Sequence, residues 1–307
     1  MDIAADSAEV LLVERGEVAL GDALDLQLGH DGESERVFTG NVVALRPSIT
    51  GVSIWALGTA VALLNTRIAS FYENQTIGAI VRDLVGQAGL STGTIDEGPL
   101  LPRFTVDGRQ SVYAHLRELA QRIGCELYSD RNGKMVFRAL GSLGGLGGAV
   151  GAVGGLPGGS GVGYTFGQHL LAAGADVRPV AWGTIDVGGE SPVSGQGTST
   201  AHWLTTNDTD YRGSAGTDAP KRLILDPAAR TKDLADTFAK GRLVVAGRRA
   251  HQIEVAVLGQ PQVDLGDTID VAGLADALIN KSGYVCFIRH HFDAQRGFVS
   301  TLRIVVT

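Results

Sequence analysis

Short runs of residues at both ends of the chain alternate between apolar and polar or small side chains, and this period of two constrains the fold most. Residues 24–28 show it near the N-terminus, where three leucines alternate with an aspartate and a glutamine, and residues 253–257 show it near the C-terminus. Residues 37–45 form a further β-rich run, and residues 284–291 and 298–306 form a predicted hairpin. Successive side chains of a strand point to opposite faces, so this alternation predicts half-buried strands. Strands of this length and spacing are typical of small barrels or sandwiches.

Residues 8–70 are therefore predicted to consist mainly of strands. Apolar residues at 10–12 and 18–20 flank a turn, and each pair is expected to lie on a strand. The segment 47–66 has no charged residue, but it contains a proline, two glycines and several hydroxyl and amide side chains. It is too polar for a membrane span, so two buried strands around a turn are expected instead.

The apolar period changes to that of a helix in the following segment. The first predicted helix has one apolar face, made of Ile77, Ile80, Val81, Leu84 and Val85. Asn74 or Thr76 can cap its first turn. A second helix is predicted to begin after Ser111 and to end at Gly124, because glycine adopts the backbone conformation that ends helices. An extended piece containing a proline connects the two helices.

A hairpin follows the second helix, since two apolar runs flank the turn dipeptide Asn132-Gly133. Residues 71–140 are thus predicted to be a helix–helix–hairpin insert. The next segment, 141–163, contains mainly Gly, Ala, Leu and Val with no charge, so it is predicted to be a long loop. A glycine-rich phosphate cradle requires a lysine at a fixed spacing, and this segment has none. One hypothesis is that the loop packs against a neighbouring subunit or projects into a channel.

The C-terminal part, 164–307, returns to β character. Four residues are expected to be buried there: Val177, Val180, Trp182 and Ile185. The dipeptide Asp226-Pro227 predicts a helix start, because proline is favoured in the first turn, and a helical insertion is expected near 227–245. Residues 261–267 are a predicted turn between strands.

Composition excludes several classes of function. The net charge is −7 and charged residues make up 19% of the chain, so no basic surface for nucleic acid is expected. The cluster Arg242, Arg248 and Arg249 is interpreted as a solvated or interfacial face. Two distant cysteines, Cys125 and Cys286, form neither a disulfide framework nor a metal cluster, and we expect both to be small buried residues of a reduced protein. The acidic N-terminus lacks the basic region of a signal peptide.

The few candidates for chemistry have simpler structural explanations. His290 and His291 are adjacent on a predicted strand, so they point to opposite faces and cannot share a metal with Asp293. Paired carboxylates that might cleave a glycan lack a defined spacing across a cleft, and they are interpreted as solvated side chains: Asp96 and Glu97, Glu118, and Asp233 and Asp236. The three tryptophans, Trp55, Trp182 and Trp203, are scattered and fit packing positions. No catalytic, cofactor-binding or metal-binding residue is nominated, and the chain is predicted not to be an enzyme.

The order of these segments resembles a known family. The chain is similar to the phage late control protein D family and to the N-terminal hub half of type VI secretion spike proteins. The resemblance lies in a "Q-T" helix, a second helix of the form L-x-x-L-A-x-x-x-G, a hairpin that ends in an aromatic residue, and a closing β module. The matching segments are 72–77, 89–90, 110–125, 133–137, 166–171, 259–261, 265–267, 283–290 and 297–302.

This resemblance implies an α+β, mainly β fold with two tube-like antiparallel β-barrels, at 1–70 and 164–307. It also implies a homotrimer, in which three copies of two barrels form a six-fold-like ring. Such a baseplate hub joins the hexameric inner tube to the trimeric spike. The expected partners are a second copy, a separate spike protein and the inner tube protein, with tape-measure, baseplate wedge or effector proteins as further partners. The particle would be assembled in the bacterial cytoplasm, and no cofactor is expected.

Two alternatives remain open from the sequence. One is a tail-associated peptidoglycan hydrolase, which would release soluble fragments from purified cell wall. The other is an adaptor that binds cargo or a membrane through residues 141–163. The sequence alone does not distinguish a phage from a secretion system or an extracellular injector.

Overall fold

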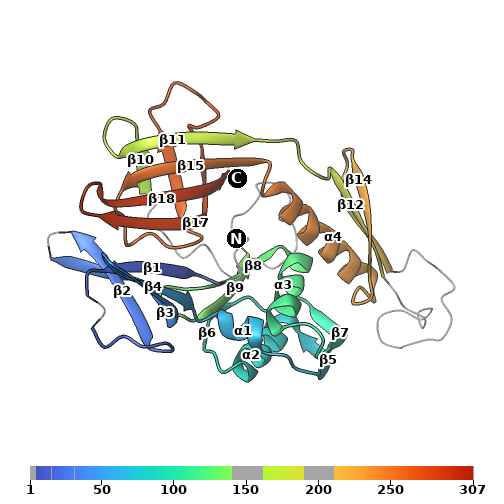
Figure 1. Ribbon diagram of the computed structural model, residues 1–307. Coiled ribbons are helices and arrows are strands. Elements are labelled where there is room, and N and C mark those ends of the chain that lie inside the picture. Colours follow the sequence, from blue (N-terminus) through green and yellow to red (C-terminus); the bar gives the residue numbers. More distant parts are fainter. Residues whose placement is uncertain (1–4, 15, 31, 140–161, 190–210, 307) are drawn as a thin grey trace.

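The computed structural model of the chain describes residues 5–14, 16–30, 32–139, 162–189 and 211–306. The described residues form two curled half-barrel sheets, three smaller sheets and four helices (Figure 1). The predicted α+β, mainly β class is therefore confirmed, with two curled sheets, a helix–helix–hairpin module and a further helix. The domain boundaries at 1–70, 71–140 and 164–307 remain a proposal. The Gly-rich segment 141–163 lies outside the described residues except for its last two positions.

The first curled sheet has the strand order β1-β4-β3-β2 and is antiparallel throughout. Its strands are β1 (Ser7–Leu12), β2 (Ala23–His30), β3 (Glu33–Ser48) and β4 (Gly51–Gly58). Every second residue of β4 is buried, including Val52 and Ile54, which pack with Val42 inside the curl. The expectation of a strand at Val18 and Leu20 is wrong, because both residues lie in the loop between β1 and β2. Apolar spacing over three residues is too short to define a strand there.

A helical module follows the first sheet. Its elements are α1 (Val61–Asn65), β5 (Ser70–Thr76), α2 (Ile77–Gln87), β6 (Thr92–Ile95), β7 (Leu100–Val106), α3 (Val112–Ile123), β8 (Cys125–Ser129) and β9 (Met135–Ala139). The side chain of Thr76 accepts a hydrogen bond from the backbone of α2, and Ser111 does the same for α3. Gly124 ends α3 with φ of 73°, as expected for a left-handed helix C-terminus. Strands β8 and β9 form the predicted hairpin.

The uncharged segment 47–66 is divided among several elements. It contains the turn between β3 and β4, the whole of β4 and the short helix α1. The expected turn between buried strands is therefore present, but the last residues are helical. Among the described residues, every helix is too short or too polar to cross a membrane.

The second curled sheet has the order β10-β16-β17-β18-β15-β11. Its strands are β10 (Val162–Thr165), β11 (Leu170–Val177), β15 (His251–Leu258), β16 (Thr268–Ala272), β17 (Ser282–Asp293) and β18 (Gly297–Val306). All neighbours pair antiparallel except β10 and β16, which are parallel. A single bridge between Phe166 and Leu170 brings the two edge strands together at one corner. Leu302 and Ile304 lie in its core.

Between β11 and β15 the chain leaves this sheet and forms a separate layer. Strands β12 (Thr184–Gly189), β13 (Arg212–Gly216) and β14 (Lys221–Asp226) make a three-stranded sheet, which α4 (Lys232–Gly247) covers on one face (Figure 1). Phe238 of α4 belongs to the same core as Ile185 of β12 and Leu116 of α3. The sheet and α4 therefore pack on the helical module rather than on the second curled sheet.

Two sequence expectations in this layer need correction. The helix begins at Lys232 with Thr231 as its cap, not near 227. The carboxylate of Asp226 accepts a hydrogen bond from the backbone of Ala228 and is held in a turn instead. Val177 and Val180 are exposed rather than buried, because they lie where the chain leaves the curled sheet. Ile185 is buried as predicted, and Trp203 lies outside the described residues.

Candidate assembly surfaces

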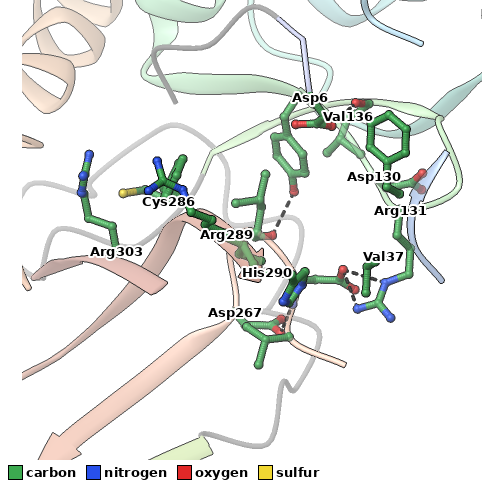
Figure 2. Close-up of a pocket in the computed structure, with 18 of the residues that line it drawn as sticks. Asp6, Val37, Asp130, Arg131, Val136, Asp267, Cys286, Arg289, His290 and Arg303 are labelled. Atoms are coloured by element: carbon green, nitrogen blue, oxygen red, sulfur yellow. Dashed lines mark hydrogen bonds and ion pairs between the residues drawn. The ribbon is translucent and has the colours of Figure 1, made fainter. Parts of the chain in front are cut away.

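A cleft of about 1320 Å³ separates the two curled sheets. The beginning of β1, strand β3 and the hairpin β8–β9 form one wall, and strands β11, β15, β17 and β18 form the other. Figure 2 shows side chains from both walls, among them Asp130 and Arg131 from the hairpin and Arg289 and His290 from β17. Both walls carry charges. The acidic lining residues are Asp6, Glu9, Asp130, Asp176, Glu254, Asp264 and Asp267, and the basic ones are Arg131, Lys134, Arg138, Arg178, Arg249, Arg289 and Arg303. Because the lining is charged and mixed in sign, the cleft does not resemble the mostly apolar pockets that bind small ligands.

Arg131, in the turn of the β8–β9 hairpin, connects the two walls (Figure 2). Its Nε donates to Asp264 Oδ1 at 2.8 Å, and its Nη2 donates to the carbonyl of Gln262 at 2.9 Å. The hydroxyl of Tyr128 donates to the carbonyl of Leu265 at 3.2 Å. The loop 261–267 is thereby attached to the hairpin. The sequence marked both segments as turns but had no signal that they meet.

Histidines join the two curled sheets at a second point. His30 Nε2 donates to the carbonyl of Gly259 at 2.9 Å, and its ring stacks on Phe298 with centroids 5.4 Å apart. His290 packs edge-on against the same Phe298, at 5.5 Å, and its Nδ1 is 2.9 Å from Ser300 Oγ. Burial, and secondarily the charge of Arg131, lower the pKa of His290 to about 4. The imidazole is therefore neutral at physiological pH and serves in packing.

The neighbouring His291 lies on the opposite side of β17, as the strand geometry predicts. Its Nε2 is 2.6 Å from Asp293 Oδ2. Backbone hydrogen bonds, above all from the amide of Arg296, together with the contact to His291, lower the pKa of Asp293 to about 2. Within the described residues, no three His, Cys, Asp or Glu side chains are grouped to hold a metal.

The carboxylates considered for glycan cleavage are separately engaged. Asp96 accepts from the amide of Ala139, while Glu97 pairs with Arg82. Glu118 pairs with Arg122, and Asp236 pairs with Lys232 within α4. None of these four, nor Asp233 in the first turn of α4, lines the cleft between the curled sheets. The structure thus does not assemble them into a pair across a cavity.

A buried ion pair joins the helical module to the segment before α4. Arg122 Nε donates to Asp226 Oδ2 at 2.7 Å, and the two side chains are 6% and 4% exposed. The guanidinium lies between the rings of Phe104 and Phe238, at 5.6 and 5.9 Å from their centroids. Glu118 also accepts from Arg122, at 2.9 Å. Such a pair specifies how the two layers are positioned, because removing either partner leaves a buried charge.

Two arginines of the basic cluster near the end of α4 belong to the same contact between layers, so of the two interpretations, a solvated or an interfacial face, the interfacial one applies to them. Arg242 donates to Gln121 Oε1, and Arg248 pairs with Glu126 and donates to the carbonyl of Gly124 at 2.7 Å. Burial lowers the pKa of Arg242. Arg249, in contrast, is exposed and lines the cleft.

Cys125 and Cys286 are free and buried, as predicted. Burial raises the pKa of both thiols, which makes them weak nucleophiles.

Both curled sheets end in strands with an unpaired side. Among the described residues, β1 and β2 form the edges of the first sheet, and β10 and β11 form those of the second. Strand β11 is eight residues long, and Asp176 is its single charged residue. Soluble proteins usually protect such edges with charges, prolines or short strands. An apolar edge of this length is therefore a candidate for contact with another chain.

Neither a family model nor a curated protein matches the chain, whereas solved structures do. One is a 43 kDa tail protein of prophage MuSo2 from Shewanella oneidensis, with a TM-score of 0.67, 16% identity, and coverage of 98% of this chain and 90% of that one. Another is a tail protein from Neisseria meningitidis, with a TM-score of 0.68, 12% identity and coverage of 99% and 88%.

A third is an E. coli protein described as a component of the type VI secretion system, with a TM-score of 0.54, 12% identity and coverage of 98% and 69%. At these identities the likeness concerns the fold. The chain has the fold of phage tail proteins and of a type VI secretion component along nearly its whole length.

Proposed function

We propose that the chain is a structural subunit of a phage tail or a related injection particle, and specifically a baseplate hub. The shared fold with two tail proteins supports the tail role. The observation that carries the hub role is that one chain contains two curled sheets, each with edges that no other described strand pairs with. Three copies supply six such sheets, which is the number required to match a hexameric tube while keeping the three-fold symmetry of a spike.

In this proposal the edges β1, β2, β10 and β11 contribute to contacts within the ring. The partners are two further copies, an inner tube protein on one face and a separate spike protein on the other. Tape-measure, wedge or effector proteins complete the baseplate. The particle is assembled in the bacterial cytoplasm, and the subunit itself has no catalytic step.

The first test is the mass of the purified protein in solution. Light scattering is expected to show about three times the chain mass of 32.0 kDa, and electron microscopy is expected to show rings with six similar lobes. Co-expression with a tube protein and a spike protein of the same particle should give a complex with both. A monomer at micromolar concentration that binds neither protein would contradict the hub role.

Incubation with purified peptidoglycan tests the alternative of a hydrolase. The hub is expected to release no soluble fragments. Release that is lost on changing one carboxylate of the candidate group, for example Glu118→Gln, would replace the proposal with the enzymatic one.

A further inference from the structure

An apolar patch lies at the free end of the first curled sheet. Glu9, Leu11 and Val13 alternate along one face of β1 and its continuation, and Leu11 and Val13 are 69% and 86% exposed. Ile49, in the turn between β3 and β4, is fully exposed at 104%. Val13 lies beside this turn, because Leu12 pairs with Val52. We call Leu11, Val13 and Ile49 the tip patch.

A second apolar patch lies on β14. Lys221, Leu223 and Leu225 alternate on the face of β14 turned away from the core, and the two leucines are 64% and 71% exposed. Ile224 on the other face packs in the shared core under α4. We call Leu223 and Leu225 the β14 patch. Large exposed apolar groups that gather in patches mark interaction sites, whereas single ones are ordinary.

The two patches have features that complement each other. Each patch includes residues of an edge strand of six residues, β1 in the tip patch and β14 in the β14 patch. The tip patch is bordered by acidic residues, Glu9 and Glu14, and the β14 patch is bordered by basic residues, Lys221 and Arg222, all of them exposed. The first sheet and the β12–β14 sheet lie at opposite ends of the molecule (Figure 1). One chain therefore cannot bring its own two patches together.

We propose that the β14 patch of one copy docks on the tip patch of the next copy around the ring. This inference rests on the proposed hub function and specifies its subunit contact. The contact is heterologous, since each copy uses two different patches, and such contacts close into rings when the rotation between copies permits. Apolar side chains meet in the centre, and the opposite charges at the rim select the partner and its orientation.

The order of residues along the two strands favours a parallel alignment. In that arrangement Glu9 lies opposite Lys221, Leu11 opposite Leu223, and Val13 opposite Leu225. An antiparallel arrangement would place the glutamate opposite a leucine instead. Opposite charges and apolar pairs across neighbouring strands are the stabilising combinations.

Cross-linking between variants that each carry one added cysteine tests the contact directly. Leu11→Cys and Leu223→Cys are made in the full-length chain, where both native cysteines are buried. A short bis-maleimide is expected to link the two variants when they are mixed and allowed to exchange subunits. Neither variant alone should form linked dimers, because the tip patch of one copy meets the β14 patch of the next and never a second tip patch. Links within a single variant, or none in the mixture, would overturn the proposal.

Charge substitution gives an independent measurement. Leu223→Asp is expected to raise the dissociation constant of the oligomer at least about tenfold, since it places a carboxylate in the centre of the contact. Leu278→Asp, at another exposed leucine in a loop of the second sheet, is the matched control and should leave assembly unchanged. Circular dichroism and the melting temperature verify that both variants fold. A wild-type dissociation constant for Leu223→Asp would contradict the contact.

The two proposals fail in different ways. If the wild-type protein forms trimers but the mixture does not cross-link, the hub function stands and the subunit contact lies elsewhere. If the wild-type protein is a monomer, both the hub function and this contact are wrong.

Discussion

At the scale of single residues, the buried pair of Arg122 and Asp226 has the largest predicted effect on stability. Arg122→Ala leaves the Asp226 carboxylate buried with Arg242 3.9 Å away as its remaining ion-pair partner. We expect a loss of about 3–5 kcal/mol in the free energy of unfolding, measured by urea denaturation. The double variant Arg122→Met with Asp226→Leu should lose less than either single variant, because neither charge of the pair is left buried without the other.

The matched control for this prediction is Arg109→Ala. Arg109 also pairs with an aspartate, Asp107, but its side chain is 89% exposed. Exposed pairs contribute about 0–1 kcal/mol. A similar loss for Arg109→Ala and Arg122→Ala would show that burial is not what makes the Arg122 pair important.

The lowered pKa of His290 makes the stability of the protein depend on pH. Its pKa is about 4 in the folded protein, below the ordinary value of 6.5, because burial opposes the charged form. Between these two values the unfolded chain binds a proton that the folded protein does not. The contribution of neutral His290 to the free energy of unfolding is therefore fully present above pH 6.5. It is lost as the pH falls towards 4, and the loss is at most about 3 kcal/mol.

Chemical denaturation at intervals between pH 4 and 7 measures this effect. His290→Gln is expected to remove this part of the pH dependence, while His291→Gln, at the exposed neighbour, should retain it. Equal slopes for the wild type and His290→Gln would refute the assignment.

At the scale of secondary-structure elements, the close approach of α3 and α4 depends on a glycine. A Cβ on Gly241 of α4 would lie 2.2 Å from the carbonyl oxygen of Arg122 in α3. Gly241→Ala must therefore push the helices apart, and we expect a loss of more than about 2 kcal/mol in the free energy of unfolding. Gly247→Ala, at the end of the same helix, meets no atom within 4 Å and should be neutral or stabilising.

Helices α2 and α3 could be predicted from the sequence, because their determinants are local. The caps Thr76 and Ser111, the terminal Gly124 and the apolar faces all lie within the helices or beside them. The start of α4 was missed for the opposite reason. Asp226 forms an ion pair with a residue 104 positions away, and no local pattern indicates this contact.

At the scale of the whole molecule, the relative position of the two curled sheets depends on a few contacts across the cleft. Arg131 provides two of them, to Asp264 and to the carbonyl of Gln262, and it also pairs with Glu35 on its own wall of the cleft. Arg131→Ala is expected to lower the free energy of unfolding by about 2 kcal/mol. It is also expected to accelerate hydrogen exchange in the loop 261–267. Lys134→Ala, in the same hairpin and also lining the cleft, is the control and should leave exchange in that loop unchanged.

The sequence by itself determined many elements of this protein: alternation set strands of both curled sheets, and helical spacing and caps set α2 and α3. These features depend on residues that are close in the sequence, so the sequence of the chain is sufficient to predict them. The tertiary structure decided which of these elements are in contact with each other. The attachment of α4 and the β12–β14 sheet to the helical module, the contacts of Arg131 and His30, and the two exposed patches all join residues far apart in sequence. Their energies arise from burial and charge pairing in space, which no local pattern records.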